Sequence, residues 1–226
     1  MIFALLILLI AFQVAYSNKV YGGVISEKII DAECIRHLYT SVVVRSYLSS
    51  GMVDPDYVGN TKHLHDHLVE WWPYMNPCFK CGNPEAQFKK LIAATTIPHK
   101  VILIYIMVDQ GWGSDVEKNR EFLTTLTSMM QESKYLPLIV TNKYNYEKIM
   151  GEDWSDLCSL PLYYQSLNGK DNCDDFVPFC GWYQAIGKIY KNNFPACTIK
   201  FDVAVGCDVS ESPFLTGEPQ GTTRAD

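Results

Sequence analysis

The chain has 226 residues, 48% of them hydrophobic, and a formal net charge of -6 at pH 7. Because it is acidic and has no block of Lys or Arg, it lacks the electrostatic signature of a nucleic-acid-binding protein, and we expect no nucleic-acid partner. The length is sufficient for one sizeable hydrophobic core, so we expect a single folded domain.

The first seventeen residues predict a signal peptide. The apolar run from Ile2 to Phe12 is shorter than the roughly twenty residues that a membrane span needs, which disfavours the alternative of a membrane anchor. Small residues at Ala15 and Ser17 suit cleavage before Asn18. We therefore expect residues 1–17 to be removed, and the mature protein to be secreted and extracellular, with no membrane association.

Hydrophobic patterning predicts an α/β chain. Apolar runs indicate eight strands, at residues 20–25, 41–46, 69–75, 101–108, 136–142, 160–165, 185–190 and 198–205. Helical spacing follows each of the first five strands, at residues 29–39, 56–68, 84–94, 115–134 and 144–150. This order predicts an irregular (β/α) TIM-like barrel of eight strands and about five helices, formed by residues 18–208. Residues 209–226, which are polar and contain Pro and Gly, predict a disordered tail.

The fourth predicted strand is the most apolar of the mature chain. Its run Val101–Val108 is rich in Ile and Val, which is typical of a strand buried on both faces, and it ends in Asp109. Alternation along the strand puts Tyr105 and Asp109 on the same face. Since chemistry in parallel α/β barrels sits at the carboxyl ends of strands, Asp109 is a candidate catalytic residue. Ser114 followed by Glu117 predicts a capping box that begins the next helix.

All eight cysteines lie beyond the predicted signal peptide, which makes disulfides the expectation for a secreted chain. We predict that Cys34, Cys197 and at least one of Cys78 and Cys81 are disulfide-bonded, although eight cysteines allow 105 pairings. The spacing of Cys78 and Cys81 also occurs in redox-active motifs. Such a motif should open a helix directly after a first strand, and this one does not, so we favour a structural disulfide.

No motif calls for a metal or a cofactor. His63 and His67 are four residues apart on a predicted helix, as in some zinc sites, but the glutamate of the hydrolytic zinc motif is absent. We interpret them as a solvated helix end and expect no metal ligands and no cofactor. The chain also lacks a nucleophile elbow, a phosphate loop and a dinucleotide-binding glycine pattern, so acyl and phosphoryl transfer have no support.

Aromatic residues gather at or just beyond the predicted strand ends. They are Trp71, Trp72, Tyr74, Tyr105, Trp112, Tyr163, Tyr164 and Trp182. Core packing explains most of them, but those at carboxyl ends could also stack against the apolar faces of sugar rings. On this basis we expect Tyr74, Trp112 and Tyr163 to line a substrate-binding cleft.

Several longer motifs point to a known family. They are VVVRSY at 42–47 with Gly51 and Asp54-Pro55 behind it, YMNPCFKC at 74–81, LPLYY at 160–164 and FVPFCGW at 176–182. In order and spacing, from about Tyr21 to Gly206, the chain resembles the lysozymes of glycoside hydrolase family 25, specifically the secreted branch of nematodes and amoebae. The resemblance implies an irregular eight-stranded barrel with five helices and a bacterial cell-wall glycan, or peptidoglycan, as the partner.

The resemblance also implies four acidic positions, and this chain departs from most of them. The family has an aspartate at the end of the first strand, where Val24 stands here. The Asp-x-Glu at the end of the fourth strand becomes Met107 to Asp109. In addition to these four positions, Trp72 stands on the third strand where the branch usually has an acid. Only Asp202 on the last strand keeps the expected type. Asp109 and Asp202 are therefore the two candidate catalytic residues.

These replacements bear on activity, because glycoside hydrolysis generally needs a carboxylic acid and a second carboxylate. The side chain of Asp109 is about 1 Å shorter than that of Glu, and a misplacement of that size can lower the rate about 10²-fold. Without an acid at position 107, the like-charge coupling that raises the pKa of a general acid is also lost.

We therefore predict a monomeric lysozyme-like protein of innate immune defence or cell-wall handling, which binds glycan through a degenerate active site without efficient hydrolysis. The alternative is an active muramidase that uses Asp109 and Asp202. A third hypothesis, from another class, is a secreted disulfide oxidoreductase that uses Cys78 and Cys81.

Overall fold

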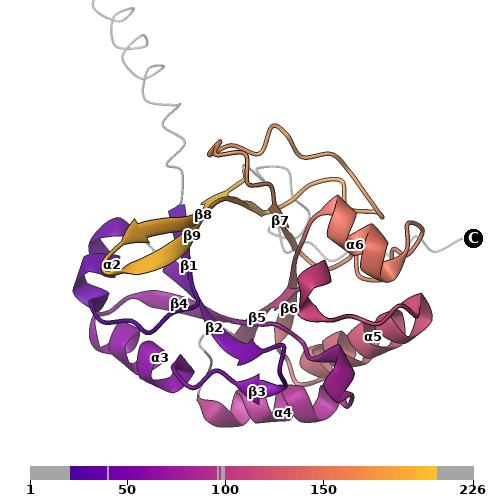
Figure 1. Cartoon of the computed structure of the whole chain (residues 1–226), viewed down its shortest axis with the longest axis horizontal. Coiled ribbons are helices and arrows are strands. Elements are labelled where there is room, and N and C mark those ends of the chain that lie inside the picture. The colour runs from indigo at the N-terminus through magenta and orange to yellow at the C-terminus, as the bar shows by residue number, and fades with distance from the viewer. Residues whose placement is uncertain (1–20, 40, 96, 98–99, 208–226) are drawn as a thin grey trace, which may run out of the picture.

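The computed structural model describes residues 21–39, 41–95, 97 and 100–207. The predicted signal peptide, residues 1–17, and the predicted tail, residues 209–226, lie outside the described residues. Within the described part of the chain, the strands form a ring with helices around its outside (Figure 1). Elements are named as in that figure.

Nine strands form one sheet that closes on itself. They are β1 (Tyr21–Ile25), β2 (Ser41–Leu48), β3 (Met52–Val53), β4 (Glu70–Met75), β5 (Val101–Tyr105), β6 (Leu136–Thr141), β7 (Leu162–Gln165), β8 (Gly187–Ala196) and β9 (Ile199–Gly206). From β1 through β2, β4, β5, β6 and β7 to β8, neighbouring strands are parallel, and β9 closes the ring by pairing antiparallel with β8 and β1. The short β3 pairs only with β2, outside the ring. The predicted eight-stranded barrel is confirmed.

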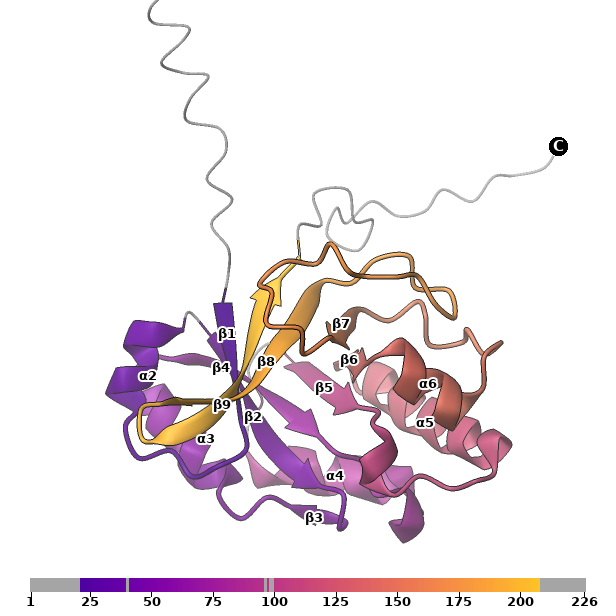
Figure 2. The same ribbon diagram turned by 45° about the horizontal axis from the view of Figure 1, so that its top comes forward.

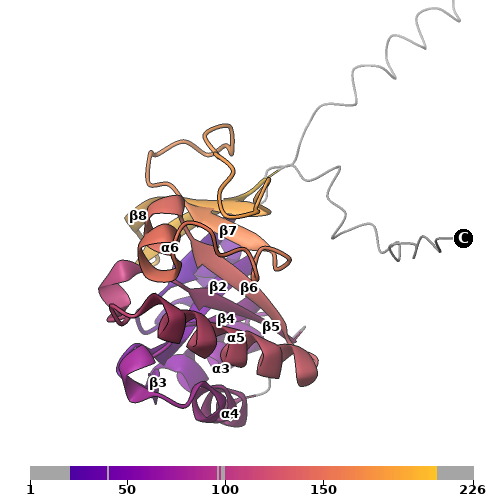
Figure 3. The ribbon, with the colours of Figure 1, turned by 90° about the vertical axis from the view of Figure 1, so that its right-hand side faces the viewer.

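Five α-helices follow the first five strands of the ring, as predicted. They are α2 (Ala32–Leu38), α3 (Tyr57–Asp66), α4 (Pro84–Ala94), α5 (Val116–Glu132) and α6 (Lys143–Met150). They lie on the outside of the barrel, and a long loop in place of a helix follows β7 (Figures 1 and 3). No helix in the described ranges is long and apolar enough to cross a membrane.

Side-chain caps begin four of these five α-helices, all but α3. Asp31 begins α2 by accepting a hydrogen bond from the N–H of Cys34 at 2.9 Å, and Asn142 begins α6 in the same way. The start of α5 differs from the prediction, because Asp115 rather than Ser114 is its N-cap. The Asp115 carboxylate accepts from the N–H of Lys118 at 3.3 Å, and its charge also favours the helix N-terminus, an advantage that a serine hydroxyl lacks.

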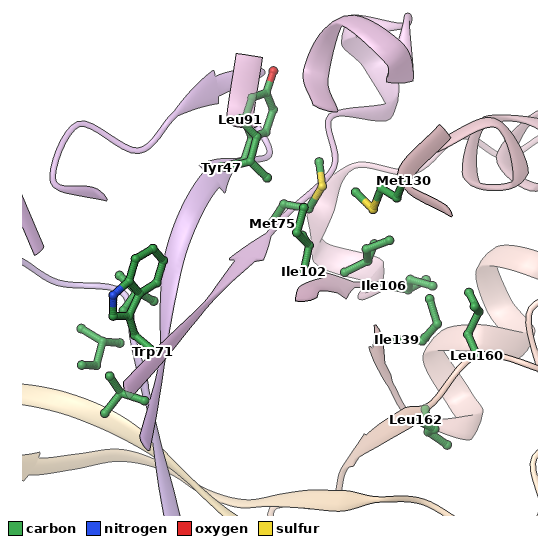
Figure 4. Packing of buried hydrophobic residues seen from close by; sticks show 14 of the residues in the cluster. Tyr47, Trp71, Met75, Leu91, Ile102, Ile106, Met130, Ile139, Leu160 and Leu162 are labelled. Carbon is green, nitrogen blue, oxygen red and sulfur yellow. The ribbon is translucent and has the colours of Figure 1, made fainter. Parts of the chain in front are cut away.

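Buried side chains form two layers, one on each face of the barrel wall. Along β5, Ile102 and Ile104 face outward, where they join the core between the strands and the helices. Figure 4 shows Ile102 in this core. Leu103 and Tyr105 face inward, into a second cluster inside the barrel. This alternation is what a strand with helices on one side and a filled barrel on the other requires.

The fourth strand of the ring is shorter than predicted. β5 ends at Tyr105, and residues Val108–Gln110 form a 3-10 helix, η3. The last ladder bond joins Ile106 N–H to the carbonyl oxygen of Val140 at 2.9 Å. Beyond it, side chains rather than a neighbouring strand accept from the backbone N–H groups, and Val108 is exposed. An apolar run alone does not show where such strand pairing stops.

Three disulfides cross-link the chain. Cys34 and Cys197 are bonded, as are Cys78 and Cys81, so these predicted disulfide residues are confirmed. The Cys34–Cys197 bond ties α2 to the turn between β8 and β9. The third bond, between Cys173 and Cys207, links the loop after β7 to the end of β9.

A buried lysine anchors the loop that replaces a helix after β7. The Lys188 side chain on β8 is fully buried. Its ammonium group donates hydrogen bonds to Asp175 Oδ1 at 2.6 Å, Asn168 Oδ1 at 3.0 Å and the carbonyl oxygen of Asn172 at 2.9 Å. The loop is therefore held by a charged group that the barrel itself supplies.

The Asp175 carboxylate at the centre of this network also accepts hydrogen bonds from Ser166 and Tyr164. Burial raises the pKa of Asp175, but the hydrogen bonds from Lys188, Ser166 and Tyr164 outweigh it and lower the pKa to about 2. Asp175 is therefore ionised at neutral pH.

Candidate active site at the barrel mouth

A pocket of about 490 Å³ lies at the carboxyl ends of the parallel strands. Strand ends and the elements that follow them supply its wall, and the arrowheads of β2 and β5 point to this side of the barrel (Figure 2). The lining residues are Ser49, Tyr74, Asn76, Tyr105, Met107, Val108, Asp109, Gln110, Asn145 and Gln165. The pocket is where barrel enzymes place their chemistry, and its volume is in the range of small-molecule sites.

Asp109 lies in this pocket, on η3, and is exposed to solvent. Two amide side chains fix the turn that carries it. Asn145 Oδ1 accepts from the N–H of Val108 at 3.0 Å, and Gln110 Oε1 accepts from the N–H of Met107 at 3.3 Å. The carboxylate is therefore held on a defined turn but stays in water.

Two tyrosines form the floor of the pocket. Tyr74 on β4 and Tyr105 on β5 are buried, and their ring centroids lie 4.5 Å apart. Burial raises the pKa of both hydroxyls well above the usual value, and the negative charge of Asp202 raises both further. The Tyr105 hydroxyl is buried without a hydrogen-bond partner among the described residues. Both tyrosines therefore stay neutral at neutral pH.

Asp202 lies on β9, directly opposite Val24 of β1 in the antiparallel register. It is partly buried, and burial raises the pKa of its carboxyl. A hydrogen bond from the N–H of Asn193 at 3.1 Å lowers the pKa, but burial has the larger effect. Its charge acts on Tyr74 and Tyr105, but Asp202 does not line the mouth pocket itself. The structure thus places Asp202 near the tyrosine floor, apart from Asp109 in the pocket wall.

Two positions at which the resemblance implies acids are apolar and packed. Val24 and Met107 are both buried in the cluster inside the barrel. Met107 lines the mouth pocket, and its sulfur accepts from Asn145 Nδ2 at 3.3 Å. Val24 instead lines an apolar cavity of about 220 Å³ in the barrel interior, together with Trp72 and Tyr163.

Of the three predicted substrate-binding aromatics, the structure brings Tyr74 to the mouth pocket. Trp112 packs in the outer core with Phe79 and Phe122, at centroid distances of 6.1 and 6.0 Å. The Tyr163 ring lies over Gly187 so closely that a Cβ on that glycine would come within 2.1 Å of it, and it faces the interior cavity.

Sequence reasoning did not single out the amide side chains of the pocket. Asn76 directly follows β4, Gln165 is the last residue of β7, and Gln110 Nε2 donates to Asn76 Oδ1 at 2.8 Å. Their position at the carboxyl ends of predicted strands is the signal that could have identified Asn76 and Gln165. Asn145 lies on α6, and only the tertiary structure brings it to the pocket.

Neither the histidine pair nor the close cysteine pair adds a reactive group to this pocket. The rings of His63 and His67 stack at 5.1 Å, and no cluster of three or more His, Cys, Asp or Glu residues suited to a metal occurs in the described ranges. Cys78 and Cys81 are bonded to each other, and Gln87 binds the backbone of Cys78 at 2.9 and 2.8 Å.

Sequence comparisons give consistent matches. The family model described as lysozyme-like protein 1 matches residues 19–190. A probable GH family 25 lysozyme 4 of Dictyostelium discoideum is 28% identical over 206 residues, which cover 88% of this chain and 96% of the relative. Lysozyme-like protein 5 of Caenorhabditis elegans is 28% identical over 155 residues, 66% of this chain and 72% of the relative.

Solved structures share the fold at low sequence identity. A family GH25 lysozyme from Aspergillus fumigatus superposes with a TM-score of 0.71 at 10% identity, covering 83% of this chain and 93% of the other. A family 25 glycosyl hydrolase from Bacillus anthracis gives a TM-score of 0.65 at 12% identity, covering 83% and 88%. Because the family model covers well over half of the sequence, and the barrel agrees with it, the chain belongs to the lysozyme-like proteins of glycoside hydrolase family 25.

Proposed function

We propose that this protein binds bacterial cell-wall glycan in the mouth pocket with little or no hydrolysis, as a secreted protein of innate immune defence or cell-wall handling. The observation that carries the proposal is the composition of the pocket wall. Asp109 is the one carboxylate among its described lining residues, Met107 is apolar, and Asp202 lies outside the wall. Hydrolysis generally needs two carboxylates that flank the same bond.

The rest of the wall suits recognition. The side chains of Asn76, Gln110, Asn145 and Gln165 present amide donors and acceptors, which match the hydroxyl and N-acetyl groups of cell-wall sugars. Because Asn145 and Gln110 are already fixed by hydrogen bonds to η3, part of the wall is held rigid before a ligand enters. Such preorganisation favours affinity.

An active muramidase is the second candidate function, and one observation favours it. Burial raises the pKa of Asp202, and a raised pKa is what a general acid needs to remain protonated. Asp109, exposed in the mouth, would then supply the second carboxylate. In this mechanism, both Asp109→Asn and Asp202→Asn should abolish turnover of peptidoglycan.

Binding and turnover measured on the same protein separate the two functions. We expect purified, oxidised protein to sediment with insoluble peptidoglycan and to release no soluble fragments. Gln165→Ala and Asn76→Ala should weaken sedimentation, whereas Gln131→Ala, which truncates an exposed amide on α5 away from the pocket, should not. If the unmodified protein hydrolyses peptidoglycan and Asp109→Asn abolishes this, the proposal of a degenerate site is wrong.

Restoring the family's acids is the constructive test. The triple variant Val24→Asp, Met107→Asp, Asp109→Glu should gain measurable turnover if the site has degenerated from an active one. Val24 and Met107 are both buried, so new carboxylates there should also lower stability. Circular dichroism must therefore show that the variant is folded before the absence of turnover is counted against the proposal.

Secretion, a monomeric state and the absence of redox activity complete the proposal. The three disulfides support an oxidising compartment. Gel filtration at micromolar concentration tests the oligomeric state. The alternative of a disulfide oxidoreductase requires a reactive Cys78–Cys81 pair at the start of a helix. Here Cys78 precedes, and Cys81 ends, a 3-10 helix of only three residues, Phe79–Cys81. Catalysis of insulin reduction by dithiothreitol would support the oxidoreductase instead.

A further inference from the structure

Two cysteines remain as thiols, and they lie next to each other. Cys158 belongs to the connection between α6 and β7, and Cys180 to the connection between β7 and β8. The sulfur of Cys158 is in contact with the carbonyl oxygen of Cys180. Neither residue takes part in the mouth pocket.

Cys180 occupies a tight turn that faces Cys158. Phe179 and Trp182 pair through two backbone hydrogen bonds of 3.2 and 2.9 Å, with Cys180 and Gly181 at the turn between them. Both turn residues have positive φ, +49° and +101°, as in a two-residue hairpin turn. A Cβ on Gly181 would lie 3.1 Å from the Cβ of Cys158, so the Cys158 side chain packs directly against this turn.

We propose that Cys158 and Cys180 form a fourth disulfide in the protein exposed to an oxidising compartment. The two thiols lose two protons and two electrons as the S–S bond forms, and a disulfide such as oxidised glutathione takes up the electrons by exchange and is reduced to two thiols. For the bond to form, the Cys180 side chain must rotate away from the carbonyl oxygen of Glu152, to which its sulfur now donates at 3.3 Å.

A hydrogen bond already holds the two segments that carry these cysteines against each other. The Trp182 indole N–H donates to the carbonyl oxygen of Leu160 at 2.9 Å, which fixes the turn against the connection that carries Cys158. The bond would join residues 22 positions apart in a part of the chain that has loops in place of helices. It would therefore close a loop without displacing a strand or a helix.

The local environment makes the bond slow to form. Burial raises the pKa of the Cys158 thiol to about 12 and that of the Cys180 thiol to about 11. Because the thiolate is the attacking species, little of either residue reacts at neutral pH. The fourth bond should therefore form after the other three, and faster at pH 9 than at pH 7.

Mass spectrometry of the full chain secreted from eukaryotic cells tests the proposal. The protein is unfolded in guanidinium with iodoacetamide and without a reductant, and is then digested. We expect no alkylated cysteine and a cross-linked peptide that contains Cys158 and Cys180. Alkylation of both residues, or a bond from either one to a different cysteine, would overturn the proposal.

Two variants provide a second readout. Cys158→Ser should leave one alkylated residue, Cys180, and should lower the melting temperature by several degrees. The matched control Ser159→Ala, which changes an exposed neighbour, should show no alkylation and an unchanged melting temperature. Equal melting temperatures for Cys158→Ser and the wild type would show that no stabilising bond was lost. If Cys158→Ser does not fold, the peptide map of the wild type still decides the question.

Discussion

The burial of the ion pair between Lys188 and Asp175 predicts which of the two residues is more costly to replace in terms of folding stability. The Lys188 side chain has no exposed surface, whereas that of Asp175 is 31% exposed. Asp175→Asn therefore leaves a cation that cannot reach water, while Lys188→Met leaves a carboxylate that can turn toward it. We expect Asp175→Asn to be the more destabilising change, although it preserves the shape of the side chain.

The magnitudes follow from the two environments. Removing one partner of a buried ion pair typically costs about 3–5 kcal/mol. In Asp175→Asn the ammonium keeps two neutral acceptors, Asn168 and Asn172, so we expect a loss near the lower limit, about 3 kcal/mol. In Lys188→Met water solvates the carboxylate and Met fills the apolar channel of the lysine stem, so we expect about 1–2 kcal/mol.

Equilibrium unfolding in urea at pH 7, followed through the fluorescence of the five tryptophans, measures both losses. The double variant Asp175→Asn, Lys188→Met should lose less than the sum of the single losses, because it leaves no unpaired charge. If Lys188→Met costs as much as Asp175→Asn, or if the two losses add, the reasoning from burial is wrong.

The pH dependence of the same pair is a further check. The pKa of Asp175 is about 2 in the folded protein and about 3.9 in an unfolded chain. Since the folded value is depressed, the pair contributes stability that is present above about pH 4 and is lost as the pH falls toward 2. This difference in pKa corresponds to at most about 2.6 kcal/mol, and solvent screening of the partly exposed carboxylate should reduce this to about 1 kcal/mol. The difference in unfolding free energy between wild type and Asp175→Asn should shrink by that amount between pH 5 and pH 2.

Two more predictions concern the barrel. Ile104 is fully buried in the outer core, so Ile104→Asp should abolish folding, and a soluble variant with native circular dichroism would contradict the burial of β5. Replacing Cys34 and Cys197 by Ser removes a bond across 163 residues and should cost about 5 kcal/mol in the chain-entropy model, whereas the same change at Cys78 and Cys81, 3 residues apart, should cost about 1.5 kcal/mol. Melting temperatures compare the two, and an equal loss would refute the entropic account.

The fold could be predicted from the sequence because its pattern is local. Residues 101–105 and 136–141 form short, continuous apolar runs, which are typical of strands buried on both faces. Each of the first five predicted strands is followed by an amphipathic segment. Parallel strands with helical connections have few possible arrangements, so the count of eight strands and five helices was enough to indicate a barrel.

The site was less predictable, because it depends on where side chains point after the strands end. The predicted orientation of Asp109 assumed that strand alternation continues to that residue. Strand pairing in fact stops at Ile106, and η3 directs the Asp109 carboxylate into solvent. Trp112 lies just beyond the same strand, but it packs in the core against Phe79, on the 3-10 helix Phe79–Cys81, and Phe122 on α5. Tyr163 turns inward because Gly187 leaves space for its ring. Each outcome depends on a distant partner that the local pattern does not contain.

The closure of the barrel through β9 has a consequence for how the chain is made. Tyr21 of β1 pairs with Val205 of β9, so one edge of the first described strand stays uncovered until the last described strand has been synthesised. Until residues 199–206 have been synthesised, the sheet cannot close, and β1 and β8 are its unpaired edge strands. A translation product that stops before β9 therefore carries two unprotected edges, and edge-to-edge association is the expected fate of such nascent chains.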